Sequence, residues 1–263
     1  MRHKIIEILG AGHPWAGSVR YFDTIGSTND EAKMLANSGA PHGTVLVADM
    51  QTGGRGRMGR SFHSPSGTGI YLSVVLRPQC RAEDLMHLTC AAAVGVCDAI
   101  ESVTGFRPGV KWINDLVANG KKLGGILTEL SLNSDGSVRY AVVGIGINCN
   151  RKAFPKELEN IATCLQSILG QAVSREELMG ALIRETERIS RRLFADKKEI
   201  MDTYKQNCVT LGQPVKVFDS HGIRSGMAID LQDDGQLVVQ FENGSIEAVG
   251  SGEVSVRGFF GYC

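Results

Sequence analysis

The sequence predicts an α+β protein with a mixed β-sheet domain, flanked by helices, and a small all-β domain at the C-terminal end. Two patterns carry this prediction. From residue 19 to residue 208, β-branched and aromatic runs alternate with stretches of helical spacing. From residue 214 onward, only short strand-like runs remain, separated by turns that carry Gly, Asp and Asn. We therefore expect one domain over residues 1–210 and a β barrel over residues 211–263.

The larger domain is expected to begin with a strand at residues 19–22. Thr28 with Glu31 fits a capping box, which opens a helix that continues to Ala40. Residues 82–103 repeat apolar side chains at helical spacing and predict a long, buried helix. Ser174 with Glu177 forms a second capping box. Further strands are expected over residues 44–48, 70–76, 121–130, 139–148, 214–217, 226–230, 237–241 and 245–249, and further helices over residues 174–194 and 197–208.

Composition limits the possible functions. The 263 residues carry 28 basic and 28 acidic side chains, and this balance argues against a general nucleic-acid-binding protein. The seven cysteines include no Cys-x-x-Cys pair and no Cys–His cluster at zinc spacing, as suits a reducing cytosol. We find no signal peptide, no apolar stretch approaching a membrane span, and too few residues before the first strand for a winged helix-turn-helix. We therefore expect a cytoplasmic protein that binds neither DNA nor a membrane.

The most informative stretch is a glycine–arginine loop (residues 49–60), which threads three arginines between four glycines. Its backbone N–H groups and guanidinium forks are suited to a phosphate or a carboxylate. Gly54-x-Gly56-x-x-Gly59 is not a dinucleotide fingerprint, because no helix pattern follows it, and no Gly-Lys-Ser/Thr triplet marks a P-loop. On composition alone, a disordered basic loop is an equal alternative.

Three other stretches place polar groups at strand and helix ends. Lys111-Trp112 ends a strand-like run just before Asn114-Asp115, so we expect the lysine to be positioned rather than solvated. Glycine alternates in Gly144-Ile145-Gly146, which favours close approach by a ligand or another backbone. The amide of Asn148 can donate and accept, as an adenine edge requires. Ser27-Thr28-Asn29 is interpreted first as a helix cap, although a cap can also offer hydroxyl and N–H groups to a polar ligand.

These motifs, in this order, resemble those of biotin protein ligases over residues 21–257. The motifs are Ser27-Thr28-Asn29, Asp49-x-Gln51-Thr52-x-Gly54-Arg55-Gly56-Arg57-x-Gly59-Arg60, Ser64-Pro65, Lys111-Trp112, Lys122-Leu123, Gly144-x-Gly146-x-Asn148, Phe154-Pro155-x-Glu157-Leu158 and Gly252-Glu253-Val254-Ser255. The resemblance implies a catalytic domain like that of class II aminoacyl-tRNA synthetases and an SH3-like C-terminal barrel. It also implies a monofunctional ligase without a DNA-binding domain.

The resemblance implies the chemistry as well. In this family the biotin carboxylate attacks the α-phosphorus of ATP, giving biotinyl-5′-AMP and pyrophosphate. A lysine of a biotin carboxyl carrier protein then displaces AMP. Biotin, and ATP with Mg²⁺, would be substrates, and no metal held tightly by the protein is expected. Because two anions must meet, we expect the site to neutralise charge and align the reactants. A homodimer is compatible with this interpretation.

The resemblance also assigns residues. Lys111 and Arg57 would be catalytic. Biotin would be bound by Ser27, Thr28, Asn29, Gln51, Arg55, Gly56, Arg57, Lys111, Gly125, Gly144 and Gly146, with the three last glycines making room for its bicyclic ring. The nucleotide would be bound by Arg55, Arg57, Lys111, Asn148, Glu253 and Arg257. The glycine–arginine loop would fold over the bound anions, and residues 150–162 would close over adenine.

Two positions depart from the family pattern, and two other functions stay open. Ile113 stands where proline is usual, which removes a fixed φ after Trp112 and would hold Lys111 less rigidly. Phe62 stands where tryptophan is common. A lipoate or octanoate ligase would share the fold, but its arginine–serine–triple-glycine loop differs from Arg55-Gly56-Arg57. A non-catalytic module could instead hold RNA or a peptide through the basic loop and the β barrel.

Overall fold

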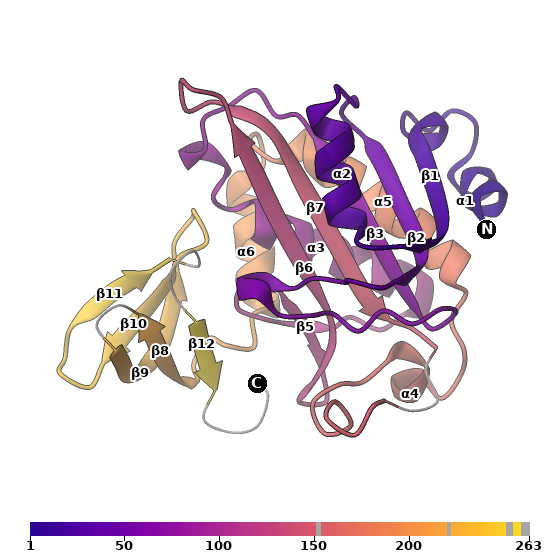
Figure 1. Cartoon of the computed structure of the whole chain (residues 1–263). Helices are drawn as coiled ribbons and strands as arrows, with labels where there is room; N and C mark the ends of the chain where they lie inside the picture. The colour runs from indigo at the N-terminus through magenta and orange to yellow at the C-terminus, as the bar shows by residue number, and fades with distance from the viewer. Residues whose placement is uncertain (151–153, 220–221, 251–254, 259–263) are drawn as a thin grey trace.

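A computed structural model describes residues 1–150, 154–219, 222–250 and 255–258. Its larger part is built on a seven-stranded sheet in the order β1–β2–β3–β7–β6–β5–β4 (Figure 1). The strands are β1 (Val19–Ile25), β2 (Thr44–Gln51), β3 (Gly69–Leu76), β4 (Gly109–Lys111), β5 (Asp115–Ala118), β6 (Lys121–Leu132) and β7 (Val138–Asn148). β1 and β2 are parallel, and all other neighbours in this sheet are antiparallel.

Helices cover both faces of this sheet, as Figure 1 shows. On one face lies α2 (Thr28–Asn37), which contacts β2, β3 and β7. On the other lie α3 (Leu88–Thr104), α5 (Arg175–Arg192) and α6 (Lys197–Asn207), with α1 (Arg2–Leu9) packed on α5. Because side chains alternate across a strand, Val45 and Val47 join the large core cluster that includes α3 and α5, whereas Leu46 packs with Ala32 and Ala36 of α2. The sheet is therefore covered twice, and only part of the α2 face is left for a site.

The structure confirms the α+β prediction and corrects several element boundaries. The capping box of Thr28 and Glu31 is wrong: Ser27 is the N-cap, and its hydroxyl accepts a hydrogen bond from the N–H of Asp30 at 3.4 Å. The cap at Ser174 is confirmed by a bond from the N–H of Glu177 at 3.2 Å. Short elements that the sequence did not predict are α1, α4 (Leu165–Leu169), strand β5, and the 3₁₀ turns Ala16–Ser18, Arg57–Gly59 and Glu83–Leu85. The long helix expected from residue 82 therefore begins as the last of these turns and continues as α3 from Leu88.

The buried helix also corrects the statement that no stretch is apolar enough to span a membrane. Glu83–Thr104 meets that test by length and hydropathy. However, 72% of its most apolar window is buried inside the protein. The small side chains of Ala91, Ala93 and Gly95 let α5 and the sheet approach closely, so this stretch is a core helix of the fold.

The C-terminal part is a five-stranded antiparallel sheet in the order β11–β10–β9–β8–β12 (Figure 1). Its strands are β8 (Pro214–Asp219), β9 (Gly222–Leu231), β10 (Leu237–Phe241), β11 (Ile246–Val249) and β12 (Ser255–Gly258), of which β12 was not predicted. It packs on the larger part around Trp112: the indole N–H donates to the carbonyl of Gly235, and the backbone N–H donates to Oγ1 of Thr210, both at 2.9 Å. The C-terminal sheet therefore helps to position the residue that follows Lys111.

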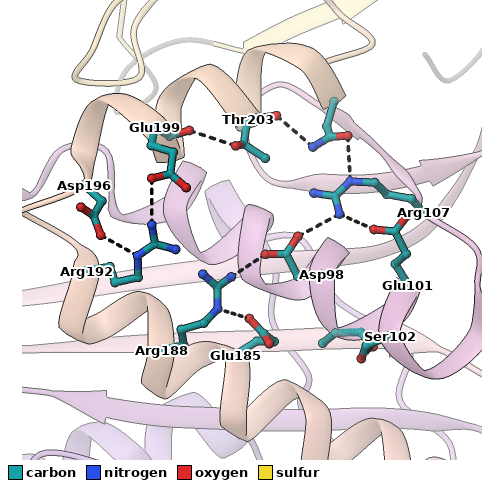
Figure 2. Close-up of polar contacts among 12 residues, drawn as sticks. Asp98, Glu101, Ser102, Arg107, Glu185, Arg188, Arg192, Asp196, Glu199 and Thr203 are labelled. Atoms are coloured by element: carbon teal, nitrogen blue, oxygen red, sulfur yellow. Dashed lines mark hydrogen bonds and ion pairs between the residues drawn. The ribbon is translucent and has the colours of Figure 1, made fainter.

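An ion-pair network joins the three helices on the far face (Figure 2). Asp98 of α3 accepts from Arg107 at 2.8 Å and from Arg188 of α5 at 2.5 Å. Arg192 of α5 donates to Asp196 at 2.5 Å and to Glu199 of α6 at 2.9 Å. These pairs tie the helices together at the surface, where such contacts are individually weak.

Candidate active site

A cavity of about 580 Å³ opens on the α2 face of the sheet, between the glycine–arginine loop and strands β4 to β7. Every residue assigned to biotin from the sequence lines it: Ser27, Thr28, Asn29, Gln51, Arg55, Gly56, Arg57, Lys111, Gly125, Gly144 and Gly146. Asn148, assigned to the nucleotide, lines it as well. Glu253 lies outside the described residues, and of Arg257 only the backbone is described, in β12. Segments far apart in the sequence thus line the same cavity.

The cavity floor, defined here as Ser27, Thr28, Asn29 and Gln51, consists of uncharged polar groups held by hydrogen bonds. Oε1 of Gln51 accepts from the N–H of Thr28 at 2.8 Å and from its hydroxyl at 3.0 Å. The amide nitrogen of Gln51 donates to Oγ of Ser64 at 3.0 Å. Thr28 therefore has a partner within the site, which explains why Ser27 rather than Thr28 caps the helix.

The glycine–arginine loop is folded back on itself rather than extended into solvent. Gln51 pairs with Ser64 and Arg55 pairs with Ser61 as isolated bridges, and the N–H of Phe62 donates to the carbonyl of Gly54 at 2.9 Å. A Cβ atom on Gly54 would lie 2.6 Å from Oγ of Ser64 and overlap the carbonyl of Phe62. A glycine is needed here because the two sides of the loop approach so closely.

Five cationic side chains also line the cavity and are called the cationic wall here: Arg55, Arg57, Arg60, Lys111 and Lys122. Burial lowers the pKa of Arg57, an effect partly opposed by Asp115. Arg57 donates to Oδ1 of Asn114 over a long distance, 3.4 Å, and the amide of Asn114 donates to the carbonyl of Ile126 at 2.8 Å. A desolvated guanidinium next to a cavity is well placed to gain from an anionic ligand.

Lys122 is a cavity residue to which the sequence assigned no role. Its ammonium contacts Oδ1 of Asp115 at 2.5 Å, and both groups lie beside Gly125. Its backbone pairs with the segment after Asn150: its N–H donates to the carbonyl of Ile161 at 2.7 Å, and its carbonyl accepts from Thr163 at 2.8 Å. This pairing brings residues 158–162 to the cavity. The signal was present in the sequence as Lys122-Leu123 within the family pattern.

Lys111 also lines the cavity, and the two residues that follow it are held by hydrogen bonds. In addition to the two hydrogen bonds of Trp112, the hydroxyl of Tyr204 donates to the carbonyl of Ile113 at 3.1 Å. Tyr204 is fully buried. The turn that lacks the usual proline is therefore anchored by α6 and by the C-terminal sheet.

The glycines of β7 face protein side chains in this structure. A Cβ atom on Gly144 would overlap the carboxamide of Asn29, and one on Gly146 would lie 2.7 Å from the ring of Phe62. The sequence expected close approach at these positions, by a ligand or by protein. The residues that approach are Asn29 and Phe62, which themselves line the cavity. Asn148 nearby donates from its amide to the carbonyl of Thr163 at 3.1 Å and retains its oxygen for other contacts.

Met58 and Arg60 of the glycine–arginine loop also line the cavity, as do Phe154, Leu158, Ile161 and Ala162 of the stretch expected to close over adenine. The cavity residues with no assigned role, besides Lys122, are Ser61, Phe62, His63, Trp112, Asn114, Asp115, Ile126, Leu127 and Ile145. No cysteine is among the lining residues. Cys97 and Cys149 are buried elsewhere, and burial raises the pKa of each thiol to about 12. Within the described part of the chain, no group of three or more His, Cys, Asp or Glu side chains is placed to hold a metal.

Comparisons with known proteins agree over nearly the whole chain. Residues 21–148 match the biotin/lipoate A/B protein ligase family, and residues 210–257 match the biotin protein ligase C-terminal domain. Bifunctional ligase/repressor BirA of Bacillus subtilis is 37% identical over 230 residues, which cover 85% of this chain and 70% of that protein. Biotin–[acetyl-CoA-carboxylase] ligase of Mycobacterium tuberculosis is 33% identical over 258 residues, 94% of this chain and 92% of that one. The structure of biotin protein ligase from Aquifex aeolicus in complex with biotin and ATP superposes with a TM-score of 0.78 at 31% identity, covering 91% of this chain and 98% of that one.

Proposed function

This chain belongs to the biotin protein ligase family, and we propose that it activates biotin with ATP and transfers the biotinyl group to a lysine of a biotin carboxyl carrier protein. The observation that carries the proposal is the pairing of two different surfaces in one cavity. An uncharged polar floor and a cationic wall line the same cavity. Biotin has the matching asymmetry, with a neutral ureido ring at one end and a carboxylate at the other.

In the first half-reaction, the carboxylate oxygen forms a bond to the α-phosphorus of ATP while the bond to pyrophosphate breaks. Both reactants are anionic, so the barrier includes their mutual repulsion. Arg57, Lys111 and Lys122 lie where they can offset that charge, and the partly desolvated setting of Arg57 strengthens its effect. Magnesium enters with the triphosphate as part of the substrate.

In the second half-reaction, the amine of the carrier lysine attacks the acyl carbon of the mixed anhydride, and AMP leaves. This step requires no covalent nucleophile from the site, because the carrier lysine provides the attacking amine. The cationic wall can contribute by stabilising negative charge on the departing AMP. We propose residues 1–210 as the catalytic domain and residues 211–263 as a second domain that positions Trp112 and hence Lys111, a role supported by the bonds of Trp112 to Thr210 and Gly235.

The floor favours biotin over the acids of lipoate or octanoate ligases. A dithiolane ring or an alkyl chain has no N–H or C=O groups, so it would give no partner to the bonding positions that the floor does not satisfy internally. Unpaired buried polar groups cost roughly 1–3 kcal/mol each. Ser27 and Asn29 are both buried, so this penalty applies to the Ser27 hydroxyl proton and to the open acceptor position of Asn29.

The test is exchange of labelled pyrophosphate into ATP, with biotin, lipoate and octanoate supplied in parallel. We expect exchange with biotin alone. Exchange with lipoate in preference would retain the mechanism but replace the substrate, and the absence of exchange with any acid would contradict the proposal. Transfer to a purified carrier domain, followed by mass spectrometry of the carrier lysine, tests the second step and the acceptor separately.

A further inference from the structure

Asn29 is held in one orientation by contacts on every side of its carboxamide. Its nitrogen donates to the carboxylate of Glu129 at 2.9 Å and to the carbonyl of Leu127 at 3.3 Å. Its oxygen accepts from the hydroxyl of Ser73 at 2.6 Å. Both N–H groups are therefore used within the protein, and only the oxygen retains an unused acceptor position.

The opposite orientation would be strongly disfavoured. A rotated carboxamide would place its oxygen against Glu129 and the carbonyl of Leu127, both of which only accept hydrogen bonds. The amide cannot move away instead, because it lies directly on Gly144, where a side chain would overlap it. Of the three groups that select the orientation, Glu129 alone carries a charge, and charged acceptors form the stronger bonds.

Lys33 pairs with Glu129 behind the cavity floor. The ammonium contacts Oε1 of Glu129 at 2.6 Å and Oδ1 of Asp30 at 3.0 Å. Burial would lower the pKa of Lys33, but the hydrogen bonds to Glu129 and Asp30 raise it overall. Oδ2 of Asp30 also meets Nε of Arg55 in the glycine–arginine loop at 3.1 Å. Glu129 is thus part of a connected ionic group that lies behind the cavity floor and reaches the loop.

We propose that Glu129 is a positioning residue that sets the hydrogen-bond polarity of the cavity floor, so that Asn29 presents an acceptor, and never a donor, to the bound acid. This inference rests on the proposed function and makes it more specific. The ligand position over Asn29 must then be an N–H donor, as in a ureido ring. The carbonyl of that ring is left to the donors of the floor, namely the Ser27 hydroxyl and the second N–H of Gln51.

The experiment compares biotin with its two cyclic-carbamate analogues, in each of which one ureido N–H is replaced by oxygen. Pyrophosphate exchange is measured for each acid with the wild-type protein and with Glu129→Gln. A glutamine can donate as well as accept, so it permits the rotated amide. We expect the biotin KM to rise roughly tenfold, the ATP KM to change less than about twofold, and the discrimination against one analogue to fall roughly tenfold.

The controls separate positioning from general damage. Glu185→Gln removes an ion pair of similar geometry, Glu185 with Arg188 at 2.5 Å, in the helical network away from the cavity, and should change none of these values. Glu129→Asp retains the charge and should recover part of the discrimination. The ratio of two substrates on the same molecules is independent of the folded fraction, so it stays informative even if Glu129→Gln lowers stability.

The outcomes are distinguishable. Wild-type protein that exchanges pyrophosphate with biotin, together with an unchanged discrimination ratio in Glu129→Gln, would overturn this inference and leave the proposed function intact. Equal increases in the KM of biotin and of ATP would also overturn it, because a change confined to the cavity floor would not weaken nucleotide binding to the same extent. Wild-type protein with no biotin-dependent exchange would instead contradict the proposed function.

Discussion

The helical ion-pair network and the cavity floor are both built from short polar contacts, but the first joins helices and the second lines a cavity. The network on the helical face pairs each drawn arginine with a carboxylate and joins α3, α5 and α6 (Figure 2). The cavity floor uses hydrogen bonds of the same length, yet Gln51 and Asn29 retain unused donor or acceptor positions next to an open space. Short polar contacts alone therefore do not identify a site; the remaining bonding capacity beside a cavity does.

The largest effects are expected at Lys111 and Lys122, the two lysines of the cationic wall. We expect Lys111→Ala and Lys122→Ala each to lower the rate of adenylate formation by about a hundredfold or more, because each removes positive charge from the place where two anions react. Single-turnover formation of biotinyl-5′-AMP measures this. Lys121→Ala is the matched control, since Lys121 precedes Lys122 on β6 but is not a cavity residue and contacts the carbonyl of Glu159.

A near-wild-type rate in one lysine variant would assign catalysis to the other lysine. The sequence favoured Lys111, whereas the structure adds Lys122 at the same cavity, paired with Asp115. Unchanged rates in both variants would contradict the role of the cationic wall.

A substitution of Arg57 tests whether the cationic wall retains biotinyl-5′-AMP after it has formed. Arg57→Ala should speed dissociation of biotinyl-5′-AMP by roughly thirtyfold, because the half-buried guanidinium would no longer offset the charge of the bound adenylate. Stopped-flow or filter-release measurements of labelled adenylate report the rate. Arg20→Ala, an exposed arginine of β1, should leave it unchanged. An unaltered dissociation rate in Arg57→Ala would show that the arginine does not retain the adenylate.

A substitution of Gly144 tests whether the position of Asn29 in the cavity floor matters for biotin binding, without removing any polar group. A methyl at this position would overlap the carboxamide of Asn29 and force it to shift. We expect Gly144→Ala to raise the biotin KM about tenfold and also to lower thermal stability, because the amide of Asn29 must give up hydrogen bonds in order to shift. Gly12→Ala has no neighbour within 4 Å of its added methyl and serves as the control. If the biotin KM were unchanged, the position of Asn29 would not matter for binding.

Asp49 gives the smallest effect and concerns stability. It pairs with buried Arg175 at 2.7 Å; although burial would raise the pKa of Asp49, its bonds to Ser66 and Arg175 lower it overall. A lowered pKa stabilises the fold above the unfolded-state value near 4, and this contribution is lost as the pH falls through the folded-state pKa. Asp49→Asn should therefore cost about 1 kcal/mol in the free energy of unfolding at pH 7 and progressively less in acid.

Denaturant unfolding at pH 7 and at acid pH measures this difference. Glu199→Gln, an exposed member of the helical network, should change the free energy of unfolding by less than about 0.5 kcal/mol at either pH. A pH-independent cost of Asp49→Asn would mean that the loss comes from packing rather than from charge.

Local sequence patterns predicted those features, such as helix caps, that depend only on residues close together in the chain. The cap at Ser174 was predicted correctly because it needs only a side chain and an N–H three residues later. The helix cap near Thr28 was displaced by one residue, because the Thr28 hydroxyl bonds Gln51 and Ser73 instead. The short helices α1 and α4 were missed, since eight and five residues carry too little periodicity.

What the sequence determined by itself is the α+β class, most strands, and a set of residues that proved to line one cavity, because these follow from periodicity and from motifs. Only the tertiary structure decided which groups meet there. Asn29 contacts Glu129 across 100 residues, and Lys122 joins Asp115 through the pairing of β5 with β6. Such contacts depend on strand register and helix placement, and a one-residue shift would move each side chain to the other face of the sheet.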